Sequence, residues 1–252
     1  MSNPFSLVGR RAMVTGANTG IGQGIALSLA AAGAEVLAVG RSSMTETEAA
    51  IRGTGGKVAA IKADLAQTAT VAPMLDAAWK DHGPIDILVN NAGIIRRADA
   101  VDFTESDWDE VLDVNLKSVF LLSQAFARQV FATARTGKIV NIASLLSFQG
   151  GIRVASYPAA KSGLAGLTRI LANEWAARGI NVNAIAPGYI ETNNTEALRN
   201  DPERSADILK RIPAGRWGSA QDIGGTAVYL ASDAANYVHG AILPVDGGWL
   251  AR

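Results

Sequence analysis

The chain has 252 residues, of which 48% are hydrophobic and 18% are charged. This is enough for one α/β domain with a sizeable core, and it excludes a disordered chain. The 23 basic and 23 acidic side chains balance, so nothing suggests a nucleic-acid or anionic-membrane partner. The absence of cysteine excludes disulfides, thiol nucleophiles and thiolate metal sites.

The first ten residues lack the apolar core of a signal peptide. The mostly apolar run near them, residues 25–34, is too short to span a bilayer and is followed by Glu35. We therefore expect a cytoplasmic protein with no membrane partner.

Short aliphatic runs alternate along the chain with longer amphipathic segments. The expected strands are 12–15, 35–39, 58–63, 86–90, 138–142, 180–185 and 242–245, and the expected helices are 21–32, 44–53, 71–82, 106–131, 157–178 and 220–230. Most of the strands are continuous apolar runs, as in strands buried on both faces. The alternation predicts a single-domain, Rossmann-like α/β fold over residues 1–252, with a doubly wound parallel sheet of seven strands and helices on both faces.

A glycine-rich turn, TGANTGIG at residues 15–22, joins the first expected strand directly to a helix. Glycine allows a tight turn there, lets backbone amides approach a pyrophosphate and permits close packing of helix on strand. The amides at the start of the helix can then hold the anion. The strand–turn–helix context predicts a dinucleotide site rather than a simple turn.

The spacing Gly-x-x-x-Gly-x-Gly resembles that of the short-chain dehydrogenase/reductase family, and the resemblance covers essentially the whole chain. Further motifs of that family follow in order: Asp64-Leu65, Asn90-Asn91-Ala92-Gly93, Asn115, Ser144, Tyr157-x-x-x-Lys161, and Pro187-Gly188 with Ile190 and Thr192. The resemblance implies an NAD(P)-dependent oxidoreductase that acts on CH–OH groups. The cofactor-binding residues expected on this basis are Gly16, Asn18, Thr19, Gly20, Ile21, Gly22, Arg41, Ser42, Asp64, Leu65, Asn91, Ala92, Gly93, Tyr157, Lys161, Pro187, Gly188, Ile190 and Thr192.

The end of the second expected strand bears on which nicotinamide is bound. Enzymes that use NAD usually carry an acidic residue there, but this chain has Gly40 followed by Arg41. No carboxylate repels a 2′-phosphate, and a guanidinium can bind one through two hydrogen bonds. Stacking of Arg41 on adenine is the alternative, and Thr19 stands where many NADP-dependent relatives carry a basic residue. We expect NADP(H), with NAD(H) as the alternative.

Tyr157 and Lys161 are four residues apart on an expected helix and therefore share one face. We expect the Lys161 ammonium to lower the pKa of the Tyr157 phenol from its ordinary value of about 10, as a general acid/base requires. Pro158 fits the first helical turn. The resemblance implies that Ser144 binds the substrate oxygen, that Lys161 also holds the nicotinamide ribose and that Asn115 positions a water in a proton relay. The expected catalytic residues are thus Asn115, Ser144, Tyr157 and Lys161.

Other chemistries find little support in the sequence. His82 and His239 have no partner at metal-ligand spacing, so no metal is expected. Asp246 is interpreted as a turn residue. The polar stretch 192–218 interrupts the alternation and is expected to be irregular and to form a substrate lid over the carboxyl ends of the strands.

Several arginines are expected in the loops at those carboxyl ends, and together they indicate an acidic substrate. They are Arg96, Arg97, Arg153 and Arg216, with Arg153 the first choice because it precedes Tyr157 by four residues. Asn193, Asn194 and Gln149 are expected to serve sugar hydroxyls. The expected substrate-binding residues are Arg96, Ser144, Gln149, Arg153, Tyr157, Asn193 and Arg216.

The stretches 93–97, 147–154, 192–195 and 212–218 and the terminal DGGWLAR resemble one branch of the family. That branch acts on 2-dehydro-3-deoxy-D-gluconate, and related reductases act on 4-deoxy-L-erythro-5-hexoseulose uronate. A 3-oxoacyl carrier-protein reductase, a gluconate 5-dehydrogenase-like enzyme and a dinucleotide-sensing regulator without turnover remain alternatives. The family's two long helices imply a homotetramer.

Overall fold

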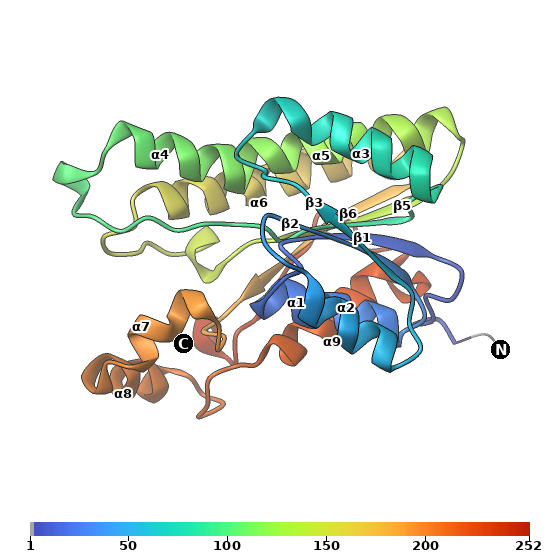
Figure 1. The fold of residues 1–252 in the computed structure, drawn as a ribbon. Coiled ribbons are helices and arrows are strands. Elements are labelled where there is room, and N and C mark those ends of the chain that lie inside the picture. The colour runs from blue at the N-terminus through green and yellow to red at the C-terminus, as the bar shows by residue number, and fades with distance from the viewer. Residues whose placement is uncertain (1–2) are drawn as a thin grey trace.

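The computed structural model describes residues 3–252 and shows a parallel sheet between two layers of helices (Figure 1). The strands are β1 (Arg11–Thr15), β2 (Glu35–Gly40), β3 (Val58–Lys62), β4 (Ile87–Asn90), β5 (Gly137–Ile142), β6 (Ile180–Pro187) and β7 (Ile242–Val245). They lie in the order β3-β2-β1-β4-β5-β6-β7, and every neighbouring pair is parallel. The predicted Rossmann-like fold with seven parallel strands is confirmed.

Each face of the sheet has its own hydrophobic core. On one face lie α1 (Gly20–Ala31), α2 (Thr45–Gly53) and α9 (Ala220–Ala231), which bury Ile25, Leu29 and Ile223. The helices over the other face are α3 (Thr68–His82), α4 (Glu105–Leu112), α5 (Ser118–Ala132) and α6 (Ser156–Trp175). Phe126 and Leu75 are fully buried there. No helix in the described part of the chain is long and apolar enough to cross a membrane.

The segment expected to form one long helix, 106–131, is interrupted. A π-helical turn, Asp113–Lys117, separates α4 from α5. The chain stays helical through this single turn, so a hydrophobicity pattern read over the whole segment does not reveal it. The turn contains Asn115, which is completely buried.

The stretch 192–218 is not irregular as expected, because it contains a 3₁₀ turn (Asn193–Thr195) and two helices, α7 (Glu196–Arg199) and α8 (Pro202–Arg211). The Asp201 carboxylate caps α8 by accepting from the backbone N–H groups of Glu203 and Arg204, at 3.1 Å each. An isolated parallel β-bridge between Ile190 and Gly218 brings the two ends of this stretch together. We call residues 192–218 the lid segment.

Candidate active site

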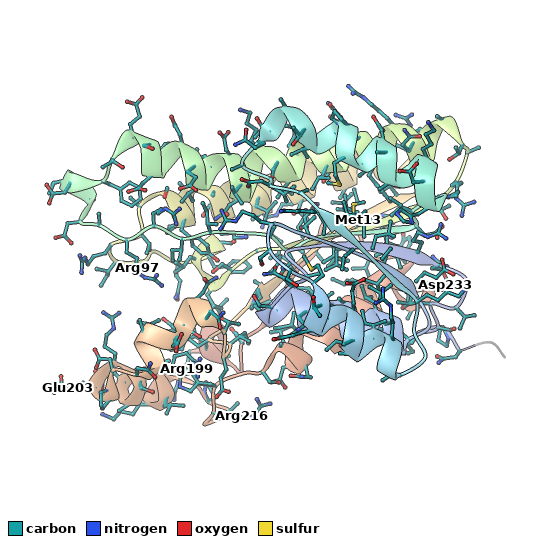
Figure 2. All side chains as sticks on the ribbon, in the orientation of Figure 1. Met13, Arg97, Arg199, Glu203, Arg216 and Asp233 are labelled. Atoms are coloured by element: carbon teal, nitrogen blue, oxygen red, sulfur yellow. The ribbon has the colours of Figure 1, made fainter. Side chains whose placement is uncertain are left out.

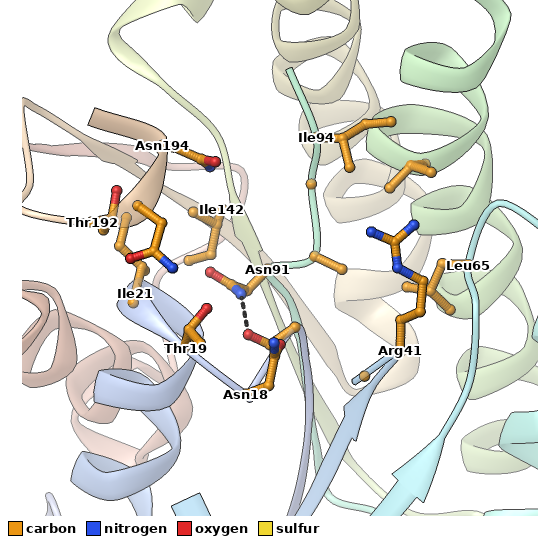
Figure 3. A pocket seen from close by; sticks show the side chains of 18 of the residues that line it. Asn18, Thr19, Ile21, Arg41, Leu65, Asn91, Ile94, Ile142, Thr192 and Asn194 are labelled. Atoms are coloured by element: carbon orange, nitrogen blue, oxygen red, sulfur yellow. Dashed lines mark hydrogen bonds between the residues drawn. The ribbon is translucent and has the colours of Figure 1, made fainter. Parts of the chain in front are cut away.

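A cleft of about 420 Å³ opens at the carboxyl ends of the strands (Figure 3). Its walls come from the loops after β1, β2, β3, β4, β5 and β6 and from the start of the lid segment. Every cofactor-binding residue expected from the sequence lines it, together with Ser144 and Asn193. In a doubly wound fold this end of the sheet is where dinucleotides and their substrates bind.

The glycine-rich turn has the geometry that a pyrophosphate requires. Gly16 and Gly20 have positive φ angles of 65° and 57°, which L side chains rarely adopt. At Gly22 a Cβ would collide with the backbone oxygen of Gly16 and the side-chain amide of Asn91. The residue before α1, Thr19, provides no side-chain cap, so the first backbone N–H groups of the helix stay available for an anion.

The loop after β4 is tied to the glycine turn by Thr15 and Asn91. The Thr15 hydroxyl accepts from the backbone N–H groups of Asn91 and Ala92, at 3.0 Å each. The Asn91 side-chain amide donates to the Thr15 carbonyl oxygen at 2.9 Å and to the Gly16 carbonyl oxygen at 3.2 Å. The two loops that flank the centre of the cleft are therefore held in one arrangement.

At the other end of the cleft, β2 ends at Gly40, and the exposed Arg41 side chain and Leu65 both line the cleft (Figure 3). Within residues 3–252 no ion pair engages the Arg41 guanidinium. The Ser42 hydroxyl accepts from the Asn18 side-chain amide at 2.8 Å. Arg41 thus forms no ion pair within residues 3–252 and no carboxylate stands at the tip of β2, although Asp64, just after the neighbouring strand β3, also lines the cleft.

Tyr157 and Lys161 lie in the first turns of α6, and Pro158 fits there as expected. The Lys161 ammonium lies 5.7 Å from the centre of the Tyr157 ring and donates to the Ile142 carbonyl oxygen at 2.6 Å. Burial lowers the pKa of Lys161 to about 8. Burial also raises the pKa of Tyr157, and the hydroxyl of Ser144 and the positive charge of Arg97 offset only part of that rise. The expectation that Lys161 lowers the pKa of Tyr157 is wrong, because desolvation of the phenol dominates.

Ser144 and Asn115 occupy different environments. Ser144 follows β5 and lines the cleft, where its hydroxyl accepts from the Leu146 N–H at 3.1 Å. Asn115 does not line the cleft. Its amide accepts from the backbone N–H of Ile94 and donates to the Ile94 carbonyl oxygen, both at 2.8 Å, which fixes the loop after β4. The relay function expected for Asn115 stays a prediction.

Comparison with known proteins adds to this geometry. Residues 16–250 match a family model described as enoyl-(acyl carrier protein) reductase. The 2-dehydro-3-deoxy-D-gluconate 5-dehydrogenase of Escherichia coli K12 is 56% identical over 248 residues, which are 98% of each chain. The chain belongs to the short-chain dehydrogenase/reductase family. It is an oxidoreductase.

Solved structures of similar proteins include a provisionally assigned 2-deoxy-d-gluconate 3-dehydrogenase from Agrobacterium tumefaciens with bound NADP. It is 64% identical, covers 100% of both chains and has a TM-score of 0.94. A gluconate 5-dehydrogenase from Burkholderia cenocepacia J2315, in complex with NADP and tartrate, is 41% identical. It covers 99% of this chain and 98% of that one, with a TM-score of 0.93.

The arginines expected to bind substrate differ in their partners. Arg96 pairs with Glu110 at 2.6 Å, and Arg153 pairs with Asp99 at 2.9 Å. Arg216 makes two hydrogen bonds of 2.8 Å to Asp222 and holds the pKa of that carboxyl far below its usual range. These three guanidinium groups already have a carboxylate, and none of the three residues lines the cleft. Arg97 does not line the cleft either, but it pairs with no carboxylate within residues 3–252 and donates to the carbonyl oxygen of Asn194, at 3.2 Å.

Two further polar residues line the cleft without having been expected there, Glu110 and Thr195. Helical periodicity could have indicated Glu110, because it lies four residues before Val114, which also lines the cleft. Gln149 lies outside the cleft, where its side-chain oxygen accepts from the Trp249 indole at 3.2 Å. Within residues 3–252, histidine and acidic side chains form no group of three or more that could hold a metal ion.

Proposed function

We propose that this enzyme uses NADP(H) to interconvert a ketone and a secondary alcohol on an acidic deoxyketo-sugar, such as 2-dehydro-3-deoxy-D-gluconate or 4-deoxy-5-hexoseulose uronate. The observation that carries the proposal is the meeting of Ser144, Tyr157 and Lys161 with the glycine-rich turn in one cleft. A nicotinamide-dependent reaction needs groups that transfer a proton to or from the substrate. It also needs a site that binds the pyrophosphate of the cofactor, here the start of a helix.

The nicotinamide, when bound, gives or takes the hydride. In the direction of reduction, Tyr157 donates its phenolic proton to the substrate oxygen, and the Ser144 hydroxyl orients that oxygen. The raised pKa of Tyr157 keeps the phenol protonated at neutral pH, as a proton donor requires. Lys161, with a pKa of about 8, can exchange a proton in the same pH range, and Asn115 holds the neighbouring loop in place.

NADP(H) rather than NAD(H) is proposed because Arg41 offers a charge without a carboxylate partner beside Gly40. Ser42, held by Asn18, adds a hydroxyl at the same point. Two of the similar structures contain NADP, which supports the same choice.

The acidic sugar is supported by the names of similar proteins and by the amides at the start of the lid segment. Asn193 and Asn194 line the cleft and suit sugar hydroxyls. We take the lid segment to cover the substrate, and a homotetramer in the cytoplasm to be the working form.

The decisive test is a panel of deoxyketo-gluconates and keto-uronates, a neutral ketose and a 3-oxoacyl thioester, each assayed with both nicotinamides. We expect the highest kcat/KM with an acidic deoxyketo-sugar and NADP(H). A higher value with the thioester or the neutral ketose would contradict the substrate assignment.

A further inference from the structure

The lid segment contains Arg199, which, like Arg97, pairs with no carboxylate in the described part of the chain. Arg199, at the end of α7, donates to the carbonyl oxygen of Thr192 at 3.3 Å. Its Nε atom is buried and has no hydrogen-bond partner among residues 3–252. A buried donor of a charged group without an acceptor is costly and rare in native structures, so the position calls for an acceptor.

Arg97 and Arg199 approach the same short turn from different parts of the fold. In Figure 2, Arg97 lies on the segment between β4 and α4, and Arg199 lies in the lid below it. Their guanidinium groups donate to the carbonyl oxygens of Asn194 and Thr192, two residues apart. Both acceptors are neutral, and each guanidinium has five N–H donors, so most of the donors remain for a ligand.

The turn between the two arginines is well fixed. The Thr195 hydroxyl donates to the Ile190 carbonyl oxygen at 2.7 Å and accepts from the Thr192 N–H at 3.1 Å. Thr192, Asn194 and Thr195 all line the cleft that contains Tyr157. Arg97 and Arg199 do not themselves line the cleft, but both are held against the turn that forms its wall.

The position of Arg97 relative to the reacting centre fits a substrate with a remote negative charge. Arg97 is close enough to Tyr157 for its charge to favour the phenolate. In 2-dehydro-3-deoxy-D-gluconate, the carboxylate at C1 lies several bonds from C5, the carbon on which a 5-dehydrogenase acts. A substrate held at Ser144 and Tyr157 can extend its carboxylate toward the turn at 192–195.

We propose that Arg97 and Arg199 together bind the carboxylate of the substrate, with Arg199 brought to it by the lid segment. The inference rests on the proposed function, because it presupposes an acidic substrate. It separates these two arginines from Arg96, Arg153 and Arg216, whose charges are already satisfied by Glu110, Asp99 and Asp222. Planar guanidinium groups that still have free donors suit a carboxylate, which accepts two parallel hydrogen bonds.

The test compares Arg97→Ala and Arg199→Ala with Arg204→Ala, a matched control that removes an exposed arginine from the same lid segment. Each variant is assayed on an acidic deoxyketo-sugar and on a neutral ketose of equal chain length in which a hydroxymethyl group replaces the carboxylate. We expect kcat/KM on the acid to fall by about 10- to 100-fold in both test variants, and on the neutral ketose by much less. Arg204→Ala should change neither by more than about threefold.

A second measurement keeps the inference testable if Arg199→Ala loosens the lid. Tartrate, used as a dicarboxylate probe, should inhibit the wild type competitively against the acidic sugar. Its inhibition constant should rise by about tenfold or more in Arg97→Ala and in Arg199→Lys, which keeps the charge but loses the planar fork. Equal losses on acid and neutral substrates, together with an unchanged tartrate constant, would overturn the assignment. A wild type that turns over the neutral ketose as well as the acid would instead overturn the proposed function.

Discussion

The Lys161 ammonium lies 2.6 Å from the carbonyl oxygen of Ile142, the last residue of β5. This bond ties α6 to the strand that leads to Ser144, so Tyr157 on α6 and the Ser144 hydroxyl after β5 keep a fixed relation. Lys161 is 4% exposed and its pKa falls to about 8. Its backbone-carbonyl bond therefore positions a lysine that can give up its proton near neutral pH.

Replacing Tyr157 by Phe should lower turnover by about two to four orders of magnitude, the usual contribution of a positioned proton-transfer group. Cofactor binding should stay nearly intact, because the change removes only the hydroxyl. Stopped-flow kinetics measure the loss of turnover, and a fluorescence titration with NADPH measures cofactor binding. Turnover within about threefold of the wild type would show that another group supplies the proton.

Arg41→Ala should lower the specificity constant for NADP(H) by about 10- to 100-fold, because charge-assisted bonds to a phosphate are lost. The constant for NAD(H) should change by less than about threefold. Steady-state kinetics with each nicotinamide, at saturating sugar, give the two values. An equal loss with both nicotinamides would indicate that Arg41 stacks on adenine instead of binding the 2′-phosphate.

Much of the fold could be predicted because each strand is a continuous apolar run between turn residues. The bounds of β7 agree with the expected 242–245, and those of the other strands differ by at most two residues at either end. Helices α7 and α8 were missed because they are short and mostly polar. Helix α8 is stabilised by the Asp201 cap and by Ile208, which packs in a cluster with Leu145, Ile212, Trp217 and Trp249.

The sequence predicts which residues form the candidate site, but it does not predict their ion-pair partners or their pKa values. Arg96 and Arg97 are neighbours in sequence, yet only the folded chain shows that Arg96 faces Glu110 while Arg97 reaches the turn at Asn194. The pKa of Tyr157 similarly depends on burial, which a four-residue spacing to Lys161 does not reveal. Motif spacing therefore identifies the residues of the candidate site. Their protonation states and their ion-pair and hydrogen-bond partners depend on tertiary packing.

Gly22→Ala should weaken cofactor binding by about tenfold or more without unfolding the protein. The added Cβ meets the Gly16 carbonyl and the Asn91 amide, so the glycine-rich turn has to move away from the shape that holds the pyrophosphate. Gly53→Ala is the matched control, because its Cβ meets nothing within 4 Å. NADPH titration of both variants gives the comparison, and equal affinities would show that the turn adapts freely.

The stability of the protein should rise with pH between about 8 and 10, because two lysines are buried. Burial lowers the pKa of Lys138 and of Lys161 to about 8 each, whereas a lysine in the unfolded chain keeps a value of about 10.4. Below pH 8 both states carry the protons, and the folded state bears the full cost of the buried charges. Between the two pKa values the unfolded chain binds more protons than the folded one, so the free energy of unfolding increases with pH.

Urea unfolding at pH 7.5, 8.5 and 9.5 measures this rise, and the window stops near pH 10 because the raised pKa of Tyr157 acts in the opposite direction above it. Lys138→Met separates the two lysines. The Lys138 ammonium donates to the side-chain oxygens of Asn181 and Asn236, at 3.0 and 2.7 Å, far from the catalytic cleft. The variant should lose its part of the pH-dependent rise and keep the part due to Lys161. A stability that is flat or falls across this window in the wild type would mean that both ammonium groups keep their ordinary pKa in the folded chain.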